Sequence, residues 1–227
     1  MKIAIIPARG GSKRIPGKNS KLFCGKPMIA WAIGCAIESK MFDKVIVSTE
    51  DESIANLSRN AGAEIPFLRP AYLADDFTPT VPVIAHAIDS CQLMGWNIEY
   101  ACCIYPCAPF LLISDLVDAF ELMQVTGANF AYPVTDYAHP IQRALRRLPA
   151  GQMQFFLPEY ELSRTQDLEK SYHDTGQFYW GKASSWQSNM KMHTDGVGML
   201  VPNWRVVDID TDDDWKRAEL LHEVFKR

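Results

Sequence analysis

Short apolar runs alternate along this chain with longer segments whose apolar residues recur at helical spacing. The expected strands are 3–7, 44–49, 64–68, 100–105 and 130–134, and the expected helices are 27–39, 51–61, 80–94 and 112–125. This alternation predicts an α/β fold, a mostly parallel sheet with right-handed crossovers and helices on both faces. Ligands of such sheets bind beyond the carboxyl ends of the strands. We therefore expect the functional site in the loops that follow Pro7, Thr49 and Tyr105.

The alternation stops between residues 136 and 171, where prolines and a glycine interrupt short segments. Two of these segments, 142–148 and 152–157, are expected as strands of an insertion. Strand character returns at 177–180, 198–201 and 205–208, and a last helix is expected over 211–226. Thr211 is its expected cap, and the aspartates at 212–214 complement the helix dipole. With no repeat or linker, 227 residues predict a single domain, 1–227, with 136–171 inserted.

Membrane and secretion signals are not found in this sequence. No apolar stretch reaches the roughly 18 residues of a membrane-spanning helix. The N-terminal apolar run is too short for a signal peptide and lacks a small-residue cleavage site. The six cysteines form no Cys-x-x-Cys pair and lie mostly in apolar surroundings, as reduced thiols do. We therefore expect a cytoplasmic protein without a membrane partner.

Basic residues are concentrated at the start of the chain. The net charge is −4, yet residues 1–37 contain no Asp or Glu and hold Lys2, Arg9, Lys13, Arg14, Lys18, Lys21 and Lys26. A basic cluster confined to one region suits a compact polyanion such as a triphosphate. A nucleic-acid binder would more often spread basic residues over several elements, so we expect no nucleic-acid partner. Composition alone leaves a solvated basic surface as the alternative.

A glycine-rich basic loop, ARGGSKRIPGKN at 8–19, directly follows the first expected strand. Gly10 and Gly11 allow close backbone approach and positive φ, so consecutive N–H groups could cradle phosphates. Arg9, Lys13 and Lys18 would offset the phosphate charge during transfer. The loop is not a Walker A motif, because Asn19 follows Lys18 where Ser or Thr is required. A dinucleotide-binding G-x-G-x-x-G is absent as well.

Near the C-terminus, Asp208 and Asp210 alternate with apolar residues. On a strand, this spacing turns both carboxylates to the same side. Adjacent carboxylates repel each other unless a cation lies between them, and oxygen ligands beside a triphosphate favour Mg²⁺. The alternative is that Asp208 ends a strand and Asp210 caps the last helix.

Three segments, in order, resemble the signatures of the cytidylyltransferases that activate sialic acids and related sugars. They are PARGGSKRIPGKN at 7–19, FLRPAYLADD at 67–76 and VDIDT with the following DW at 207–215. The resemblance extends over essentially the whole chain. It implies a Rossmann-like fold of the nucleotide-diphospho-sugar transferase type. It also implies a reaction in which an acidic nine-carbon sugar attacks the α-phosphorus of CTP and pyrophosphate leaves.

The resemblance further implies roles for individual residues. The expected catalytic residues are Arg9, Lys18, Asp208 and Asp210, with the two aspartates holding Mg²⁺. The expected nucleotide-binding residues are Ala8, Arg9, Gly10, Gly11, Ser12, Lys13, Lys18, Asn19, Arg69 and Thr80. For Arg69, an ion pair with Asp75 or Asp76 is the alternative. Lys18 is assigned to the α-phosphate because a flexible ammonium can follow moving charge.

The sugar half of the chain resembles the branch that activates pseudaminic acid. The expected sugar-binding residues are Tyr105, Gln142, Arg143, Arg164, His173 and Gln177. Tyr105 stands where the common sialic acid enzymes tend to have Gln, and His173 singly could be a surface or core histidine. The insertion 136–171 resembles a dimerisation arm, so a homodimer is expected.

Several alternatives remain open at this point. N-acetylneuraminic, legionaminic and Kdo-type acids compete with pseudaminic acid as the sugar. A P-loop-like kinase and a non-catalytic nucleotide-binding protein are the alternatives from other functional classes.

Overall fold

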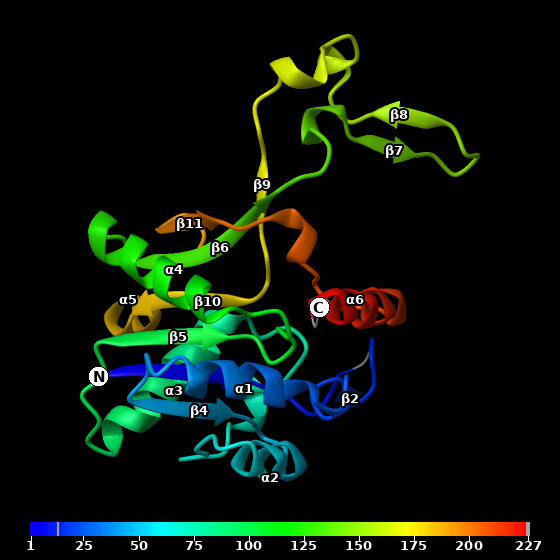
Figure 1. Ribbon diagram of the computed structural model, residues 1–227. Helices are drawn as coiled ribbons and strands as arrows, with labels where there is room; N and C mark the ends of the chain where they lie inside the picture. The colour runs from blue at the N-terminus through cyan, green and yellow to red at the C-terminus, as the bar shows by residue number, and fades with distance from the viewer. Residues whose placement is uncertain (13, 226–227) are drawn as a thin grey trace.

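A mostly parallel sheet forms the centre of the computed structural model, which describes residues 1–12 and 14–225 (Figure 1). Its strands run in the order β11-β6-β10-β5-β1-β4, with β9 paired to β6. β1 is parallel to β4 and β5, and β11 is parallel to β6, whereas β10 runs antiparallel between β5 and β6. The strands are β1 (Lys2–Pro7), β4 (Lys44–Ser48), β5 (Tyr100–Ile104), β6 (Phe130–Asp136), β9 (Tyr172–Asp174), β10 (Phe178–Lys182) and β11 (Gly196–Leu200).

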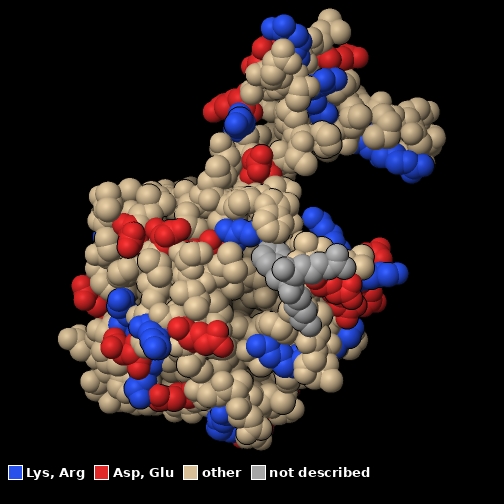
Figure 2. All heavy atoms as spheres, in the orientation of Figure 1, with Lys and Arg blue, Asp and Glu red and all other residues tan. Residues whose placement is uncertain are grey.

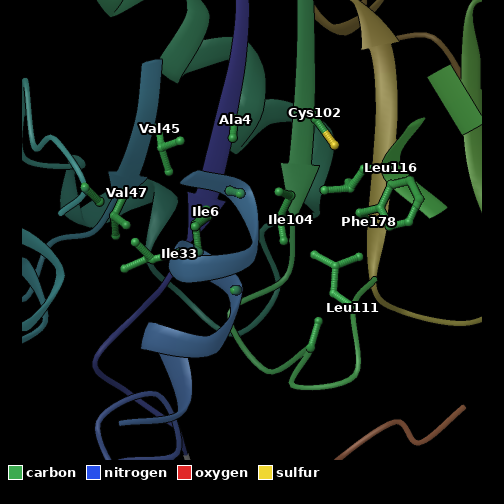
Figure 3. Close-up of a cluster of buried hydrophobic side chains, with 14 of the residues drawn as sticks. Ala4, Ile6, Ile33, Val45, Val47, Cys102, Ile104, Leu111, Leu116 and Phe178 are labelled. Carbon is green, nitrogen blue, oxygen red and sulfur yellow. The ribbon is translucent and has the colours of Figure 1, made fainter. Parts of the chain in front are cut away.

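Helices cover both faces of this sheet, as predicted. They are α1 (Met28–Glu38), α2 (Glu52–Asn60), α3 (Thr80–Leu93), α4 (Ile113–Thr126), α5 (Ala183–Gln187) and α6 (Asp212–Phe225). Because side chains alternate along a strand, β1 serves two cores. Ala4 and Ile6 pack with residues of α1, α2 and α4 (Figure 3), whereas Ile3 and Ile5 pack with residues of α3 and α5. No helix in the described residues is long and apolar enough to cross a membrane.

Two expected strands are wrong. The segment 64–68 forms only one bridge, between Glu64 and Ile46, because Pro66 has no N–H to continue the ladder. The segment 205–208 begins in a 3-10 turn, Asn203–Arg205, and continues extended without a partner strand. The Arg205 side chain turns inward there and pairs with Asp115 of α4. Asp208 and Asp210 therefore lie on an unpaired segment.

The C-terminal helix packs away from the central sheet, contrary to expectation. Trp215, Ala218 and Leu221 lie on one face of α6, as the spacing predicted, and Phe225 falls where side chains are not described. Their partners include Ile15 and Phe23, around a small hairpin of β2 (Leu22–Phe23) and β3 (Lys26–Pro27) that the sequence did not predict. Thr211 caps the helix as expected, because the Asp214 N–H donates to its hydroxyl at 3.2 Å. Because α6 packs on Ile15 and Phe23, its start lies beside the basic loop that follows β1.

Residues between β6 and β9 leave the body of the molecule as an arm (Figure 1). Its hairpin consists of β7 (Leu145–Arg147) and β8 (Met153–Phe155), shorter than the two strands predicted there. The arm stands clear of the body in the space-filling view (Figure 2). Its exposed apolar side chains include Ile141, Leu145, Met153, Phe156 and Leu162.

A buried ion pair makes a test of this fold possible. Arg205 Nη2 donates to Asp115 Oδ1 at 2.8 Å, and the two side chains are 8% and 6% exposed. Asp115→Ala would leave a buried charge unpaired, so the free energy of unfolding should fall by about 3–5 kcal/mol. The thermal midpoint should then drop by about 6–20 °C. Asp118→Ala, on the exposed face of α4, is the control and should change little; equal midpoints for the two variants would contradict the pairing.

Candidate active site

A cavity of about 710 Å³ lies at the carboxyl ends of β1 and β5, where the strand order predicted a site. This volume is within the range of small-molecule sites, about 300–1,000 Å³. The chain segments that meet here are the loop after β1, residues 69–83, the loop after β5, the turn before β10 and the segment before α6. Its lining residues include Arg9, Ser12, Arg14, Lys18, Asn19, Arg69, Thr80, Tyr105, Cys107, Gly176, Asp208 and Asp210.

Most expected nucleotide-binding residues reach this cavity. The structure brings Arg9, Ser12, Lys18, Asn19, Arg69 and Thr80 to its wall. Ala8, Gly10 and Gly11 belong to the same loop but are not among the lining residues. Lys13 lies outside the described residues.

The glycines of the loop agree with one part of the prediction and not with the other. Gly10 and Gly11 do not adopt positive φ; Gly17 does, at 62°. Close backbone approach is found at Gly10, because a Cβ there would collide with Asp51, which caps α2. The Gly10 N–H donates to Glu50 Oε1 at 2.7 Å. The loop is thus anchored on the loop after β4, while Gly11 faces open space.

Lys18 joins the basic loop to the C-terminal aspartates. Its Nζ donates to the Ile209 carbonyl at 2.6 Å and lies 3.5 Å from Asp210 Oδ1. Arg14 pairs with the other oxygen of Asp210. Two cations and one carboxylate from opposite ends of the chain are therefore assembled at one wall of the cavity.

Asn19 holds the loop in shape. Its side-chain amide donates to the Arg9 carbonyl at 3.0 Å, and its oxygen accepts from the Cys107 thiol at 3.3 Å. Burial raises the pKa of Cys107 to about 12, so the thiol is neutral near pH 7. This favours a role for Cys107 in the cavity wall over a nucleophilic one.

Arg69 pairs with a residue that the sequence did not single out. Its Nη2 donates to Glu50 Oε2 at 2.7 Å, and not to Asp75 or Asp76, which was the alternative. The side chain is only 4% exposed, and its Nε lacks a hydrogen-bond partner among the described residues. The Arg69 side chain lines the cavity, so its guanidinium can donate to a ligand bound there. Asp76 pairs with Arg9 instead, at 2.7 Å.

Asp208 and Asp210 both line the cavity although their segment is not a strand. Burial, followed by the charge of Asp210, raises the pKa of Asp208. In the described part of the chain, no Lys, Arg or His lies within ion-pair distance of Asp208. Asp210 does not cap α6, since Thr211 does. A bound cation would stabilise the ionised form of Asp208, whose pKa is raised, beside the negative charge of Asp210.

These two carboxylates fit a hard divalent cation. No third His, Cys, Asp or Glu joins them among the residues described. Mg²⁺ is commonly held by one or two carboxylates together with substrate phosphates and water. The chain therefore offers a partial ligand set that a nucleotide triphosphate could complete.

The expected sugar-binding residues are dispersed. Tyr105 lines the main cavity, and its hydroxyl shares a 2.8 Å hydrogen bond with Thr80. His173 lines a second cavity of about 620 Å³ together with Tyr132, Val134, Tyr172, Asp174, His193, Gly198 and Leu200. Gln177 is buried, and its Oε1 has no hydrogen-bond partner among the described groups.

The other three expected sugar-binding residues lie on the arm, and none lines the main cavity. Gln142 donates to the Glu169 carbonyl at 3.0 Å, and Arg164 pairs with Asp167 at 2.7 Å. Arg143 is exposed in a 3-10 turn, Ile141–Arg143. The contacts of Gln142 and Arg164 stay within the arm. In one copy of the chain, therefore, none of the three side chains reaches the main cavity.

Comparison with known proteins defines the class of this site. Residues 3–146 match the family model described as cytidylyltransferase, and the chain belongs to that family. It is 38% identical to the pseudaminic acid cytidylyltransferase of Campylobacter jejuni, over 98% of this chain and 96% of the relative. It is 30% identical to the CMP-N,N'-diacetyllegionaminic acid synthase of Legionella pneumophila, over 98% and 96% of the two chains. The predicted class, a nucleotidyltransferase, is confirmed, and the P-loop kinase alternative is set aside.

Solved structures support the fold assignment. The CMP:2-keto-3-deoxy-manno-octonic acid synthetase complexed with CTP matches with a TM-score of 0.71 at 16% identity, over 98% of each chain. The 4-diphosphocytidyl-2C-methyl-D-erythritol synthase of Anaerococcus prevotii matches with a TM-score of 0.61 at 10% identity, also over 98% of each chain. At these identities the likeness concerns the fold alone.

Proposed function

We propose that this protein transfers CMP from CTP to the anomeric hydroxyl of a nonulosonic acid, with pseudaminic acid preferred, and releases pyrophosphate. The observation that carries the proposal is that one cavity joins the basic loop after β1 to Asp208 and Asp210. The near full-length identity to a pseudaminic acid cytidylyltransferase supports the choice of sugar. The sugar oxygen bonds to the α-phosphorus, the α–β phosphate bond breaks, and the hydroxyl proton passes to solvent. No covalent intermediate on the enzyme is required.

In this proposal, the side chains that line the cavity have separate roles in the reaction. Lys18, with Arg9 and Arg14, lies where a triphosphate over the loop would sit, and these groups would offset its charge. Arg9 and Arg14 would exchange their carboxylate partners for phosphate oxygens. Arg69, which lines the same cavity, would donate to the base. Asp208 and Asp210 would hold Mg²⁺, which neutralises phosphate charge and favours ionisation of the attacking hydroxyl.

A second copy of the chain is proposed to cover the arm. The hairpin of the arm has no core of its own, since β7 is exposed throughout and Met153 of β8 is exposed as well. A homodimer would bury that apolar surface, and it could also bring the arm residues Gln142, Arg143 and Arg164 to the partner's site. Sedimentation of the full chain should give a dimer mass; a monomer at micromolar concentration would contradict this arrangement.

Sugar preference should be measurable with the wild-type enzyme. One wall of the main cavity is aromatic, because Tyr105 lines it and is backed by the buried Tyr179 at 5.4 Å between ring centroids. Tyr179 in turn packs against Tyr132 of the second cavity at 5.8 Å. Such a wall suits a deoxygenated sugar with two acylamino groups better than a hydroxyl-rich tail, whose unpaired polar groups cost about 1–3 kcal/mol each. We expect kcat/KM for pseudaminic acid to exceed that for N-acetylneuraminic acid by at least roughly tenfold to a hundredfold.

The measurement is pyrophosphate release with saturating CTP and Mg²⁺, across pseudaminic, legionaminic, N-acetylneuraminic and Kdo-type acids. Comparable kcat/KM values for pseudaminic and N-acetylneuraminic acids would overturn the preferred sugar while leaving the reaction intact. No release with any of the acids would contradict the proposed function itself.

A further inference from the structure

Asp174, at the end of β9, lines the second cavity, and Gly176, two residues later, lines the main one. Its Oδ1 accepts hydrogen bonds from the Gly176 N–H at 2.8 Å and from the Tyr179 hydroxyl at 2.9 Å. Its Oδ2 lies 2.8 Å from His193 Nε2. One partly buried carboxylate therefore ties together β9, β10 and the segment before β11.

Two of these contacts lead to the main cavity. The Tyr179 ring packs against Tyr105, whose hydroxyl is hydrogen-bonded to Thr80 at the cavity wall. Gly176 lines the same cavity and has a φ of 63°, and a Cβ placed on it would lie 3.7 Å from the Asp208 carboxylate. Asp174 therefore bonds to Tyr179, which packs on the aromatic wall, and to Gly176, which lies beside one proposed metal ligand. It does not line the main cavity itself.

The third contact leads to the second cavity. His193 is 55% exposed and lines that cavity beside Asp174. Its ring meets Tyr132 and Tyr179 edge-on, at 5.2 and 6.0 Å between centroids. An imidazole that donates from Nε2 to this carboxylate fixes where the carboxylate points.

We propose that Asp174, held by His193, is a positioning residue that sets the affinity for the acidic sugar and contributes little to nucleotide binding. The inference rests on the proposed function, because it assumes that an acidic sugar binds beside the Tyr105–Tyr179 wall. The carboxylate holds Tyr179 behind Tyr105 and fixes the turn at Gly176 beside Asp208, so this side of the main cavity has one fixed shape.

The test is a comparison of kinetic constants in four variants of the full chain. Asp174→Asn and His193→Phe should each raise KM for pseudaminic acid by about 10- to 100-fold, the range for loss of a charged hydrogen bond. KM for CTP should change by less than about twofold and kcat by less than about tenfold. His193→Gln, which can still donate to Asp174, should restore most of the sugar affinity. Asp195→Asn removes a neighbouring exposed carboxylate whose side chain accepts, among the residues described, from the Lys191 N–H alone, and it should behave as wild type.

The outcomes separate this inference from the proposed function. Absence of pyrophosphate release by the wild type would contradict the proposed function. Normal wild-type turnover with an unchanged sugar KM in Asp174→Asn, or with sugar and CTP affected equally, would overturn the inference alone. If Asp174→Asn does not fold, His193→Phe and His193→Gln decide, and equal sugar KM values for these two variants would overturn it.

Discussion

Asp210→Ala is expected to lower kcat/KM by at least about two to three orders of magnitude, as loss of a major charge-stabilising group does. Asp210 lies on the same cavity wall as Asp208, and its charge helps to raise the pKa of Asp208. Removing it relieves that repulsion, so the fold should survive. Pyrophosphate release measures the loss, and circular dichroism checks the fold. Asp213→Ala, an exposed acid in the first turn of α6, is the matched control and should keep wild-type rates.

A metal role must be separated from a role in pairing with Arg14 and Lys18. EDTA should abolish wild-type turnover, and added Mg²⁺ should restore it. Binding of Mn²⁺, followed by its paramagnetic signal at CTP concentrations that saturate each variant, should weaken in Asp210→Ala and stay normal in Arg14→Ala. Full activity of Asp210→Ala in EDTA would contradict the metal assignment.

Lys18→Met is expected to lower kcat by at least about a hundredfold, with a smaller rise in KM for CTP. Its side chain is 18% exposed, and its ammonium is held against Ile209 and Asp210 at the cavity wall, where it can follow charge that develops on the α-phosphate. Steady-state kinetics with CTP varied at saturating sugar give both constants. Lys21→Met is the control, because Lys21 lies over the Trp215 ring and does not line the cavity.

An effect of Lys18→Met on KM alone would assign Lys18 to ground-state binding. A crystal structure with CTP bound away from the 8–19 loop would contradict the whole nucleotide site.

Local pattern predicted much of this fold, because helices and buried strands leave periodic signals. The alternating side chains of β1, with Ala4 and Ile6 on one face and Ile3 and Ile5 on the other, explain why helices on both faces could be predicted. The prediction was wrong at 64–68, where Pro66 interrupts pairing, and at 205–208, where Arg205 turns inward to Asp115. The pairing partner of Arg205 lies 90 residues earlier in the chain, beyond what a local pattern reports.

The sequence predicted which charged residues form the candidate site, but not which side chains contact one another there. The basic loop and the two aspartates carry local signals of charge and spacing, and both line the cavity. Glu50 and Asp174 do not stand out in sequence, because their partners Arg69 and His193 are 19 residues away in each case. The rule that strand ends build the site pointed to the loop after Thr49, but it did not identify Glu50 there.

The central claim is that CMP is transferred from CTP to an acidic nine-carbon sugar. The most direct measurement is phosphorus NMR of the wild-type enzyme with CTP, Mg²⁺ and pseudaminic acid, with the sugar product identified by mass. The account predicts that pyrophosphate and a CMP-linked sugar appear in equal amounts as CTP disappears. CDP with a phosphorylated sugar, or CTP left intact with every acid tested, would contradict it.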